Sequence, residues 1–438
     1  VFAGEGAAAD YAGLRAAGAV AVVRKSATVS PAEQATAAHE AGALLLLVVA
    51  QAPGRLYTDY GVAGSDAPIE VAALRQSEGE ALIRKIEGSR TVRLTATGKK
   101  YASYVYDLAD PYLGAVPGKL VQRATDANTS RRTLVFYGTD EITSEGRGVI
   151  VPWRTFDVLF EWYVKAGSTR TDYVSAHPWL TWFQDVRRWD AAGGEVSEQR
   201  GHSSVYKGGT SGTDTWYQPV LRPAIQDRTN NTPHRIGSTF VANIAPWGDA
   251  AGHSGFLPWS PDQTTMALWR GDTKVASSRD HQLYWWEATP EKAGYRLVQD
   301  ATRDPEVYPL SPEVHSEWTF SMGQTADEVL LPLLTPTVKV DTDLAGRARW
   351  GTQALYLSGY HQAGSTGGGT IGIASLEASY DGGRTWTKAT AQRIAGGWKM
   401  LVKNPVSAKN GQVTLRVILA DDRGNKVTQT VHRAYTLK

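Results

Sequence analysis

Hydrophobic and polar positions follow one pattern before about residue 100 and another after it. Residues 19–23 and 44–49 are continuous apolar runs, and between them stands Ser30-Pro31-Ala32-Glu33. Serine at an N-cap, proline at the first helical position and glutamate three residues after the cap are typical of a helix start. Two continuous apolar strands on either side of a helix predict a parallel α/β unit. Further predicted elements are a strand at 68–72, a helix opening with a capping box at Ser77, and a closing strand at 91–97.

After residue 100, short runs rich in Val, Thr, Tyr and Trp alternate with Gly, Pro, Asp and Ser turns. This pattern predicts strands of β-sandwiches, and no long amphipathic helix stands among them. The predicted strands include residues 133–137, 148–153, 156–164, 240–245 and 295–299. Residues 190–235 are polar and rich in glycine, so we expect a loop there. If Trp285 and Trp286 lie in a strand, they must point to opposite faces, so one of them is expected to be exposed or at a domain junction.

Composition excludes several classes of function. The 46 Lys and Arg residues nearly balance the 44 Asp and Glu residues, so the net charge of +2 lacks the basic excess of a nucleic-acid binder. Cysteine is absent, which excludes disulfides, thiolate metal sites and cysteine nucleophiles. The longest apolar run, residues 43–50, is far shorter than the roughly 20 residues of a membrane span.

The first 100 residues resemble a protease-associated domain. The ordered elements that carry the resemblance are Val20-Ala21-Val22-Val23-Arg24, Ala41-Gly42-Ala43, the apolar run 44–49, Pro68-Ile69-Glu70-Val71 and Gly79-Glu80-Ala81-Leu82. The chain departs from the family in having Lys25-Ser26 where Arg-Gly is common, and in lacking cysteine. The resemblance implies a small domain that lies beside a protease's catalytic cleft.

The rest of the chain resembles the region that follows the catalytic domain in secreted actinobacterial subtilisin-like serine proteases. The matching segments are Asn243-Ile244-Ala245-Pro246-Trp247-Gly248-Asp249, Glu317-Trp318-Thr319-Phe320, Ser379-Tyr380-Asp381-Gly382-Gly383-Arg384-Thr385-Trp386 and Asp422-Arg423-Gly424-Asn425. The resemblance implies a secreted, extracellular and non-catalytic region. Its implied partners are an upstream catalytic domain and protein or peptide substrates. The chain begins Val1-Phe2 without Met, so we expect it to be part of a longer protein.

Pattern and resemblance together predict a multidomain, mainly β architecture. An N-terminal α/β protease-associated domain at 1–100 is followed by β-sandwich domains of jelly-roll or immunoglobulin-like type. We expect these at 101–235, 236–340 and 341–438, the last of them immunoglobulin- or fibronectin-like because its short strands and turns have that spacing.

Catalytic motifs are missing from the sequence, so no catalytic residue is assigned. The nearest match to a subtilisin-type nucleophile is Ser211 in Gly209-Thr210-Ser211, which continues as a turn-like Gly-Thr-Asp. Ser254, in Gly252-His253-Ser254-Gly255, lacks the frame of a nucleophile elbow. The histidines lack zinc-binding spacing. Residues 421–425 could bind calcium through hard oxygen ligands, but they lack the spacing of an EF-hand, and a hairpin turn is favoured. No other cofactor is expected.

Two groups of residues are the remaining candidates. The loop from Gln51 to Ala67 is long for an α/β connection, and its side chains suit transient protein contacts. Its candidate contact residues are Arg55, Tyr57, Tyr60 and Asp66. The segment 379–386 fits the Asp-box of sialidases in a single copy, which we interpret as a structural turn. Asp381 would accept backbone N–H groups, Gly383 would supply a positive φ, and Trp386 would pack beneath.

Three classes of function remain open at this stage. The first is an accessory region that recruits protein substrate to an upstream catalytic domain, restricts access to it or stabilises it. The second is a carbohydrate- or cell-wall-binding module, for which the 15 tryptophans are the argument. The third is a self-contained hydrolase whose site is assembled from distant residues.

Overall fold

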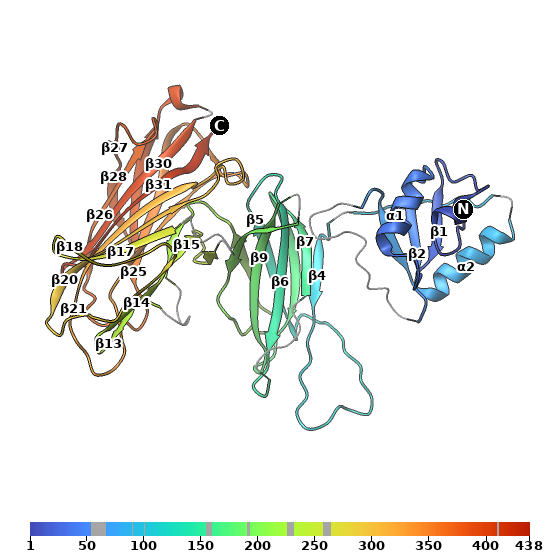
Figure 1. Cartoon of the computed structure of the whole chain (residues 1–438), viewed down its shortest axis with the longest axis horizontal. Helices are drawn as coiled ribbons and strands as arrows, with labels where there is room; N and C mark the ends of the chain where they lie inside the picture. Colours follow the sequence, from blue (N-terminus) through green and yellow to red (C-terminus); the bar gives the residue numbers. More distant parts are fainter. Residues whose placement is uncertain are drawn as a thin grey trace. The chain divides into compact units, whose positions relative to one another are not determined.

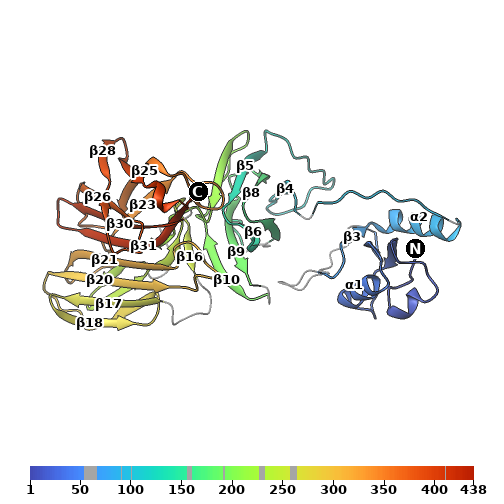
Figure 2. The same cartoon turned by 90° about the horizontal axis from the view of Figure 1, so that it is seen from above.

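The computed structural model of this 438-residue chain describes residues 1–53, 67–89, 91–99, 101–154, 160–190, 193–225, 232–256, 264–409 and 411–438. The chain consists of two compact units (Figures 1 and 2). One comprises residues 1–100 with 189–194, and the other comprises residues 101–188 and 195–438. Strands dominate the fold, and no helix of the described residues is long and apolar enough to cross a membrane.

The first unit is built on a parallel sheet in the order β1-β2-β3. Its elements are β1 (Val20–Arg24), α1 (Pro31–Glu40), β2 (Leu45–Val49), β3 (Val71–Leu74), α2 (Gln76–Glu87) and the short 3₁₀ turn η1 (Ala8–Tyr11). Leu46 and Val48 of β2 pack in one apolar cluster with alanines of α1, and Leu47 and Val49 pack in another with Ile83 of α2. Both faces of β2 are therefore buried, which explains its continuous apolar run.

Local signals placed the first helix correctly and the later elements less well. The capping box of α1 is confirmed: the Ser30 hydroxyl accepts the Glu33 N–H, and the Glu33 carboxylate accepts the Ser30 N–H. The capping box predicted at Ser77 is wrong, because α2 begins at Gln76 after Arg75, which makes no side-chain cap. The closing strand predicted at 91–97 is also wrong, since residues 91–99 form no regular element.

The second unit begins with a β-sandwich of two sheets. One sheet has the order β11-β5-β8-β4 and the other β16-β10-β9-β6-β7. Leu134 and Phe136 from the first sheet pack against Val186 from the second. The strands of the first sheet are β4 (Tyr104–Asp107), β5 (Thr129–Phe136), β8 (Ser168–Ser175) and β11 (Ser211–Trp216). Those of the second are β6 (Ile142–Ile150), β7 (Phe160–Lys165), β9 (Thr181–Trp189), β10 (Glu195–Arg200) and β16 (Ser254–Phe256).

The loop predicted for residues 190–235 is wrong in part, because it contains β10 and β11. The sequence of β11, Ser-Gly-Thr-Asp-Thr-Trp, has a turn-like composition, yet it pairs in parallel with β5. Arg132 of β5 and Asp214 of β11 form a two-pronged ion pair, with N–O distances of 2.9 and 2.5 Å. A contact between residues 82 positions apart, invisible in local composition, thus holds this strand in the sheet.

The remainder of the second unit is a larger sandwich with one continuous core. Its main sheet runs β18-β17-β20-β21-β31-β30-β26-β27, and the facing sheet runs β23-β25-β29-β28. The strands of the main sheet are β17 (Thr264–Arg270), β18 (Thr273–Ser278), β20 (Ala293–Thr302), β21 (Glu313–Met322), β24 (Arg347–Ala348, paired to β31), β26 (Ile371–Ser379), β27 (Thr387–Lys388), β30 (Gln412–Asp421) and β31 (Lys426–Leu437). Those of the facing sheet are β23 (Leu334–Val340), β25 (Gly351–His361), β28 (Thr390–Ile394) and β29 (Gly397–Asn404), followed by the 3₁₀ turn η3 (Val406–Ala408).

Two smaller sheets complete the unit, in the orders β19-β14-β13-β22 and β12-β15. Their strands are β12 (Arg222–Ala224), β13 (His234–Ile236), β14 (Thr239–Asn243), β15 (Ala245–Gly248), β19 (Gln282–Trp285) and β22 (Val329–Leu330). Trp285 ends β19 with 9% of its surface exposed, whereas Trp286 is 65% exposed. The expectation that one of these neighbours is exposed is confirmed.

A domain boundary was expected between residues 340 and 341, but the main sheet runs across it. β21 pairs with β31 along seven residue pairs, from Glu313 opposite His432 to Thr319 opposite Lys426. One apolar cluster also extends from Val220 to Leu437. The segments 236–340 and 341–438 therefore share a sheet and a core.

Candidate functional site

Of the predicted contact loop, the described residues include only Gln51 to Pro53 and Ala67. Arg55, Tyr57, Tyr60 and Asp66 all lie outside the described residues. Their role as a contact surface stays a prediction.

The Asp-box segment forms a tight turn between β26 and β27. One Asp381 carboxylate oxygen accepts the N–H groups of Arg384 and Thr385 at 3.0 and 2.9 Å, and the other accepts the Thr385 hydroxyl. These hydrogen bonds, led by that of the Thr385 hydroxyl, hold the pKa of Asp381 far below its usual range. Gly383 has φ +93°, and half-buried Trp386 lies near it with the guanidinium of Arg416 over its ring.

The turn proposed as a weak calcium candidate has its central carboxylate engaged by protein donors. Asp421 accepts backbone N–H groups from Gly369, Arg423 and Asn425, and its side chain also contacts His361. Burial alone would raise the pKa of Asp421, but hydrogen bonds, including one from the Asn425 amide, outweigh burial and bring it to about 2. Across the described ranges, no group of three His, Asp or Glu side chains could hold a metal ion.

The two serines considered as nucleophiles lie in unsuitable surroundings. Ser211 is an exposed residue at the start of β11. His253 is oriented by Asp249, with 3.0 Å between its Nδ1 and the carboxylate, but its ring stacks on Trp216. The hydroxyl of the adjacent Ser254 is buried and hydrogen-bonds to nothing in the described part of the chain. His253 and Ser254 therefore do not form a nucleophile and base pair.

A cluster of exposed tyrosines lies on the outer face of the sheet β11-β5-β8-β4. Tyr104 and Tyr106 of β4 are 59% and 51% exposed. The ring of Tyr106 stacks on that of Tyr173 from β8, with 4.7 Å between centroids and 16° between planes. Tyr104 meets Tyr106 edge to face at 5.9 Å. These three residues are called the tyrosine face below.

Residues beside the tyrosine face on the same side of the sheet are mostly threonines. Arg131 of β5 stands opposite Tyr173, and Thr171 stands opposite Tyr104. Thr133 and Thr213 continue the row across β5 and β11. The face therefore offers aromatic rings, hydroxyl groups and one guanidinium.

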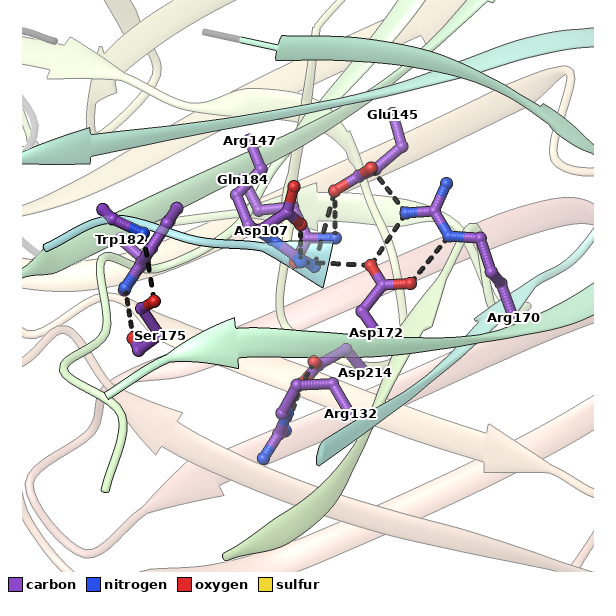
Figure 3. A network of polar contacts seen from close by, with 11 residues as sticks. Asp107, Arg132, Glu145, Arg147, Arg170, Asp172, Ser175, Trp182, Gln184 and Asp214 are labelled. Atoms are coloured by element: carbon purple, nitrogen blue, oxygen red, sulfur yellow. Dashed lines mark hydrogen bonds and ion pairs between the residues drawn. The ribbon is translucent and has the colours of Figure 1, made fainter. Parts of the chain in front are cut away.

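The opposite side of this sheet is anchored by a buried cluster of charges (Figure 3). Arg147 of β6 pairs with Asp107 of β4, with Asp172 of β8 at 3.0 Å and with Glu145 at 3.4 Å. Arg170 donates to both oxygens of Asp172 at 2.7 and 2.8 Å and to Glu145 at 2.7 Å. All five side chains are almost fully buried. We call these residues the charge cluster.

The charge cluster contains three carboxylates and two guanidiniums. For Arg147, burial lowers the pKa, but its three carboxylate neighbours outweigh burial and raise it. Asp107 has the opposite balance: burial raises its pKa to about 6, and Arg147, which it shares with Glu145 and Asp172, offsets this only in part. Folding thus makes the Asp107 carboxylate easier to protonate.

Strand alternation connects the charge cluster to the tyrosine face. In β4, Tyr104 and Tyr106 point outward, while Val105 and Asp107 are buried. The pairing of Asp107 with Arg147 therefore ties this four-residue edge strand to the other sheet, and this places Tyr106 against Tyr173. Sequence reasoning missed both groups. The alternation Tyr-Val-Tyr-Asp was readable, but Arg147, the partner of Asp107, lies 40 positions away.

Replacing Asp107 with asparagine is expected to change how stability depends on pH. Because folding raises the pKa of Asp107, its contribution is fully favourable below the unfolded-state pKa near 4 and is lost as pH rises through about 6. Asparagine does not titrate, so the variant's free energy of unfolding should rise relative to that of the native chain between pH 4 and pH 7. Urea unfolding of both proteins across this range measures the difference. If the native chain instead gained stability relative to the variant as pH rises, Arg147 would stabilise the Asp107 carboxylate more than burial disfavours it.

Comparisons with known proteins leave the family open. No family model and no curated protein matches the chain. Among solved structures, an aminopeptidase from Aneurinibacillus sp. strain AM-1 is similar at TM-score 0.20 and 20% identity, over 24% of this chain and 31% of that chain. This chain thus spans about a third of the length of the aminopeptidase.

Two further similar structures consist of fibronectin(III)-like modules and of Ig domains. Fibronectin(III)-like modules of Clostridium thermocellum CbhA align at TM-score 0.17 and 12% identity, over 49% of this chain and 94% of theirs. The N-terminal eight Ig domains of Down Syndrome Cell Adhesion Molecule align at TM-score 0.18 and 8% identity, over 71% of this chain and 48% of that chain. At such scores these likenesses assign neither a family nor an activity to this chain.

Proposed function

We propose that this chain is the non-catalytic accessory region of a secreted subtilisin-like serine protease, and that its tyrosine face holds protein substrates for the catalytic domain. The observation that carries the proposal is the stacking of exposed Tyr106 on Tyr173, with Tyr104 against its edge. Tyrosine rings give a large contact area at low cost in conformational entropy, and aromatic residues and arginine are enriched in protein interfaces. Arg131, opposite Tyr173, adds an arginine to the aromatic rings of this face.

Composition of the face favours a protein over a sugar as its ligand. Sugar recognition commonly combines ring stacking with carboxylate or amide side chains, which pair with adjacent hydroxyl groups. The outward positions of the described strands around the tyrosine face carry threonine and arginine instead. Sequence motifs of the second unit support the protease context, since Asn243–Asp249 and the segment 379–386 resemble the region after a subtilisin-type catalytic domain.

Substituting the tyrosines should weaken binding to protein without harming the fold. The double variant Tyr104→Ala and Tyr106→Ala is expected to bind immobilised, denatured casein at least about tenfold more weakly than the native chain, the loss typical of removing an interface anchor. Biolayer interferometry measures the affinity, and gel electrophoresis should recover the casein uncut. Tyr356→Ala is the matched control, because Tyr356 is 49% exposed on β25 in another sheet. Equal affinities for the double variant and the control would remove the tyrosine face as the binding surface.

A carbohydrate- or cell-wall-binding role is favoured by a different observation. Trp153 and Trp179 are 42% and 41% exposed and meet edge to face at 5.3 Å, with His177 against Trp179. If this pair binds sugar, Trp179→Ala should lose binding on a glycan array while Trp350→Ala, also an exposed tryptophan, keeps it. If casein binding depends on the tyrosine face and the glycan array shows no binding, the carbohydrate-binding role is excluded and the protein-binding role is supported.

A further inference from the structure

A small cavity lies among loops of the second unit, and none of its lining residues belongs to the tyrosine face or the charge cluster. Its volume is about 40 Å³, and the residues that line it include Glu141, Arg188, Tyr217, Arg303 and Tyr308. The loops around it are tied together by hydrogen bonds. The Gly138 N–H donates to the Leu344 carbonyl at 2.8 Å, and the Tyr308 hydroxyl donates to the Val196 carbonyl. The loops that form the cavity are therefore held in place by hydrogen bonds within the fold.

Arg303 is a buried cation whose contacts are neutral groups. It is 5% exposed, and its Nε and Nη2 donate to the carbonyl oxygens of Ser311 and Leu310 at 3.1 and 2.7 Å. The rings of Trp247 and Tyr308 lie against its guanidinium at 4.3 and 4.4 Å. None of these hydrogen bonds involves Nη1. This nitrogen is buried without an acceptor in the described part of the chain.

Arg188 brings a second guanidinium to the same cavity. Its Nη1 lies 3.3 Å from Glu141, its Nη2 donates to the Tyr137 carbonyl at 2.8 Å, and its Nε is buried without an acceptor. Glu141, which also accepts the Thr139 N–H, pairs with Arg188 and is the one carboxylate among the residues that line the cavity, whereas Arg188 and Arg303 supply two guanidiniums. Burial lowers the pKa of Arg303 to about 9, and Arg188 contributes to this lowering, but the group stays charged at neutral pH. The cavity wall carries one uncompensated positive charge.

We propose that this cavity is a binding site for a small inorganic anion of about the size of chloride, held by Nη1 of Arg303 and by Arg188. A buried charge without a counterion is costly, and charge-assisted hydrogen bonds to an anion would satisfy both unpartnered N–H groups. The volume suits a monatomic anion, since a single water needs roughly 10–15 Å³ by the same measure. The bound anion joins the β-sandwich at 101–216 to the loops at 303–310 and 344–346, so it stabilises their packing.

Bromide replaces chloride chemically and is visible by anomalous diffraction. Crystals of the full chain grown in sodium bromide should show an anomalous peak within hydrogen-bonding distance of Arg303 Nη1. In solution, sodium bromide or chloride should raise the melting temperature of the native chain by several degrees more than that of Arg303→Met. Sulfate stabilises proteins by exclusion from their surface, so it should shift both proteins equally. Water density at Nη1, or equal halide shifts in both proteins, would overturn the site.

Glu141→Gln provides a second variant in case Arg303→Met does not fold. Removing the competing carboxylate leaves both guanidiniums in place and should tighten halide binding, which appears as a larger halide-dependent rise in melting temperature than the native chain shows. Glu287→Gln makes the same change of charge at an exposed position and should behave as the native chain does. A halide response of Glu141→Gln no larger than that of Glu287→Gln would contradict the proposal. This inference does not depend on the tyrosine face or on the protease context.

Discussion

Replacing Arg147 with methionine is expected to lower the free energy of unfolding of the second unit by about 3–5 kcal/mol. Arg147 is the guanidinium that touches all three carboxylates of the charge cluster. Without it, Glu145, Asp172 and Asp107 remain buried with only Arg170 to balance them. Urea unfolding monitored by tryptophan fluorescence measures the loss. Arg296→Met is the control, because Arg296 pairs with Glu317 at the surface, where ion pairs contribute only about 0–1 kcal/mol.

A second substitution in the same background separates lost packing from unpaired charge. Adding Asp107→Asn to Arg147→Met removes one of the carboxylates that the first substitution leaves unpaired. The double variant should therefore be more stable than Arg147→Met alone at neutral pH. If Arg147→Met costs no more than the surface control, water must reach these carboxylates, and the cluster would not be the anchor of β4.

Residues near in sequence explain what could be foreseen about the fold. Ser30, Pro31 and Glu33 define the start of α1 within four positions, and the two hydrogen bonds of the cap join Ser30 and Glu33 within one turn. The contrast between Trp285, the last residue of β19, and exposed Trp286 directly after it also lies between neighbours in the sequence. Such signals need no knowledge of the tertiary fold.

Pairings between distant residues account for what could not be foreseen. Asp214 holds β11 in the sheet by pairing with Arg132 of β5. Arg147 pairs with carboxylates on β4 and β8 as well as with Glu145 on its own strand. A sequence indicates that charged residues are present, but it does not indicate which of them meet in the interior. The cavity beside Arg303 is equally hidden, because its wall comes from five separate segments. The tyrosine face falls between these cases, since its strand was readable and its partner Tyr173 was not.

Replacing Trp318 with alanine is expected to destabilise the larger sandwich by about 3–5 kcal/mol, the range for emptying a large aromatic site in a core. Trp318 is 1% exposed at the middle of β21, opposite Leu297 of β20 on one side and Val427 of β31 on the other. Its indole N–H also donates to the Leu334 carbonyl at 2.8 Å, and that acceptor would lose its partner. Trp286→Ala, at a site that is 65% exposed, should cost little by comparison.

The same variant tests whether residues 236–340 and 341–438 unfold as one body. Because β21 joins β20 to β31 within one sheet, Trp318→Ala should reduce the hydrogen-exchange protection of both neighbouring strands together. Two separate domains would respond differently: amides of β17 and β20 would lose protection, while those of β30 and β31 would keep it. Joint loss would place the contact between β21 and β31 at the centre of one cooperative core, where a boundary between two domains was expected from the sequence.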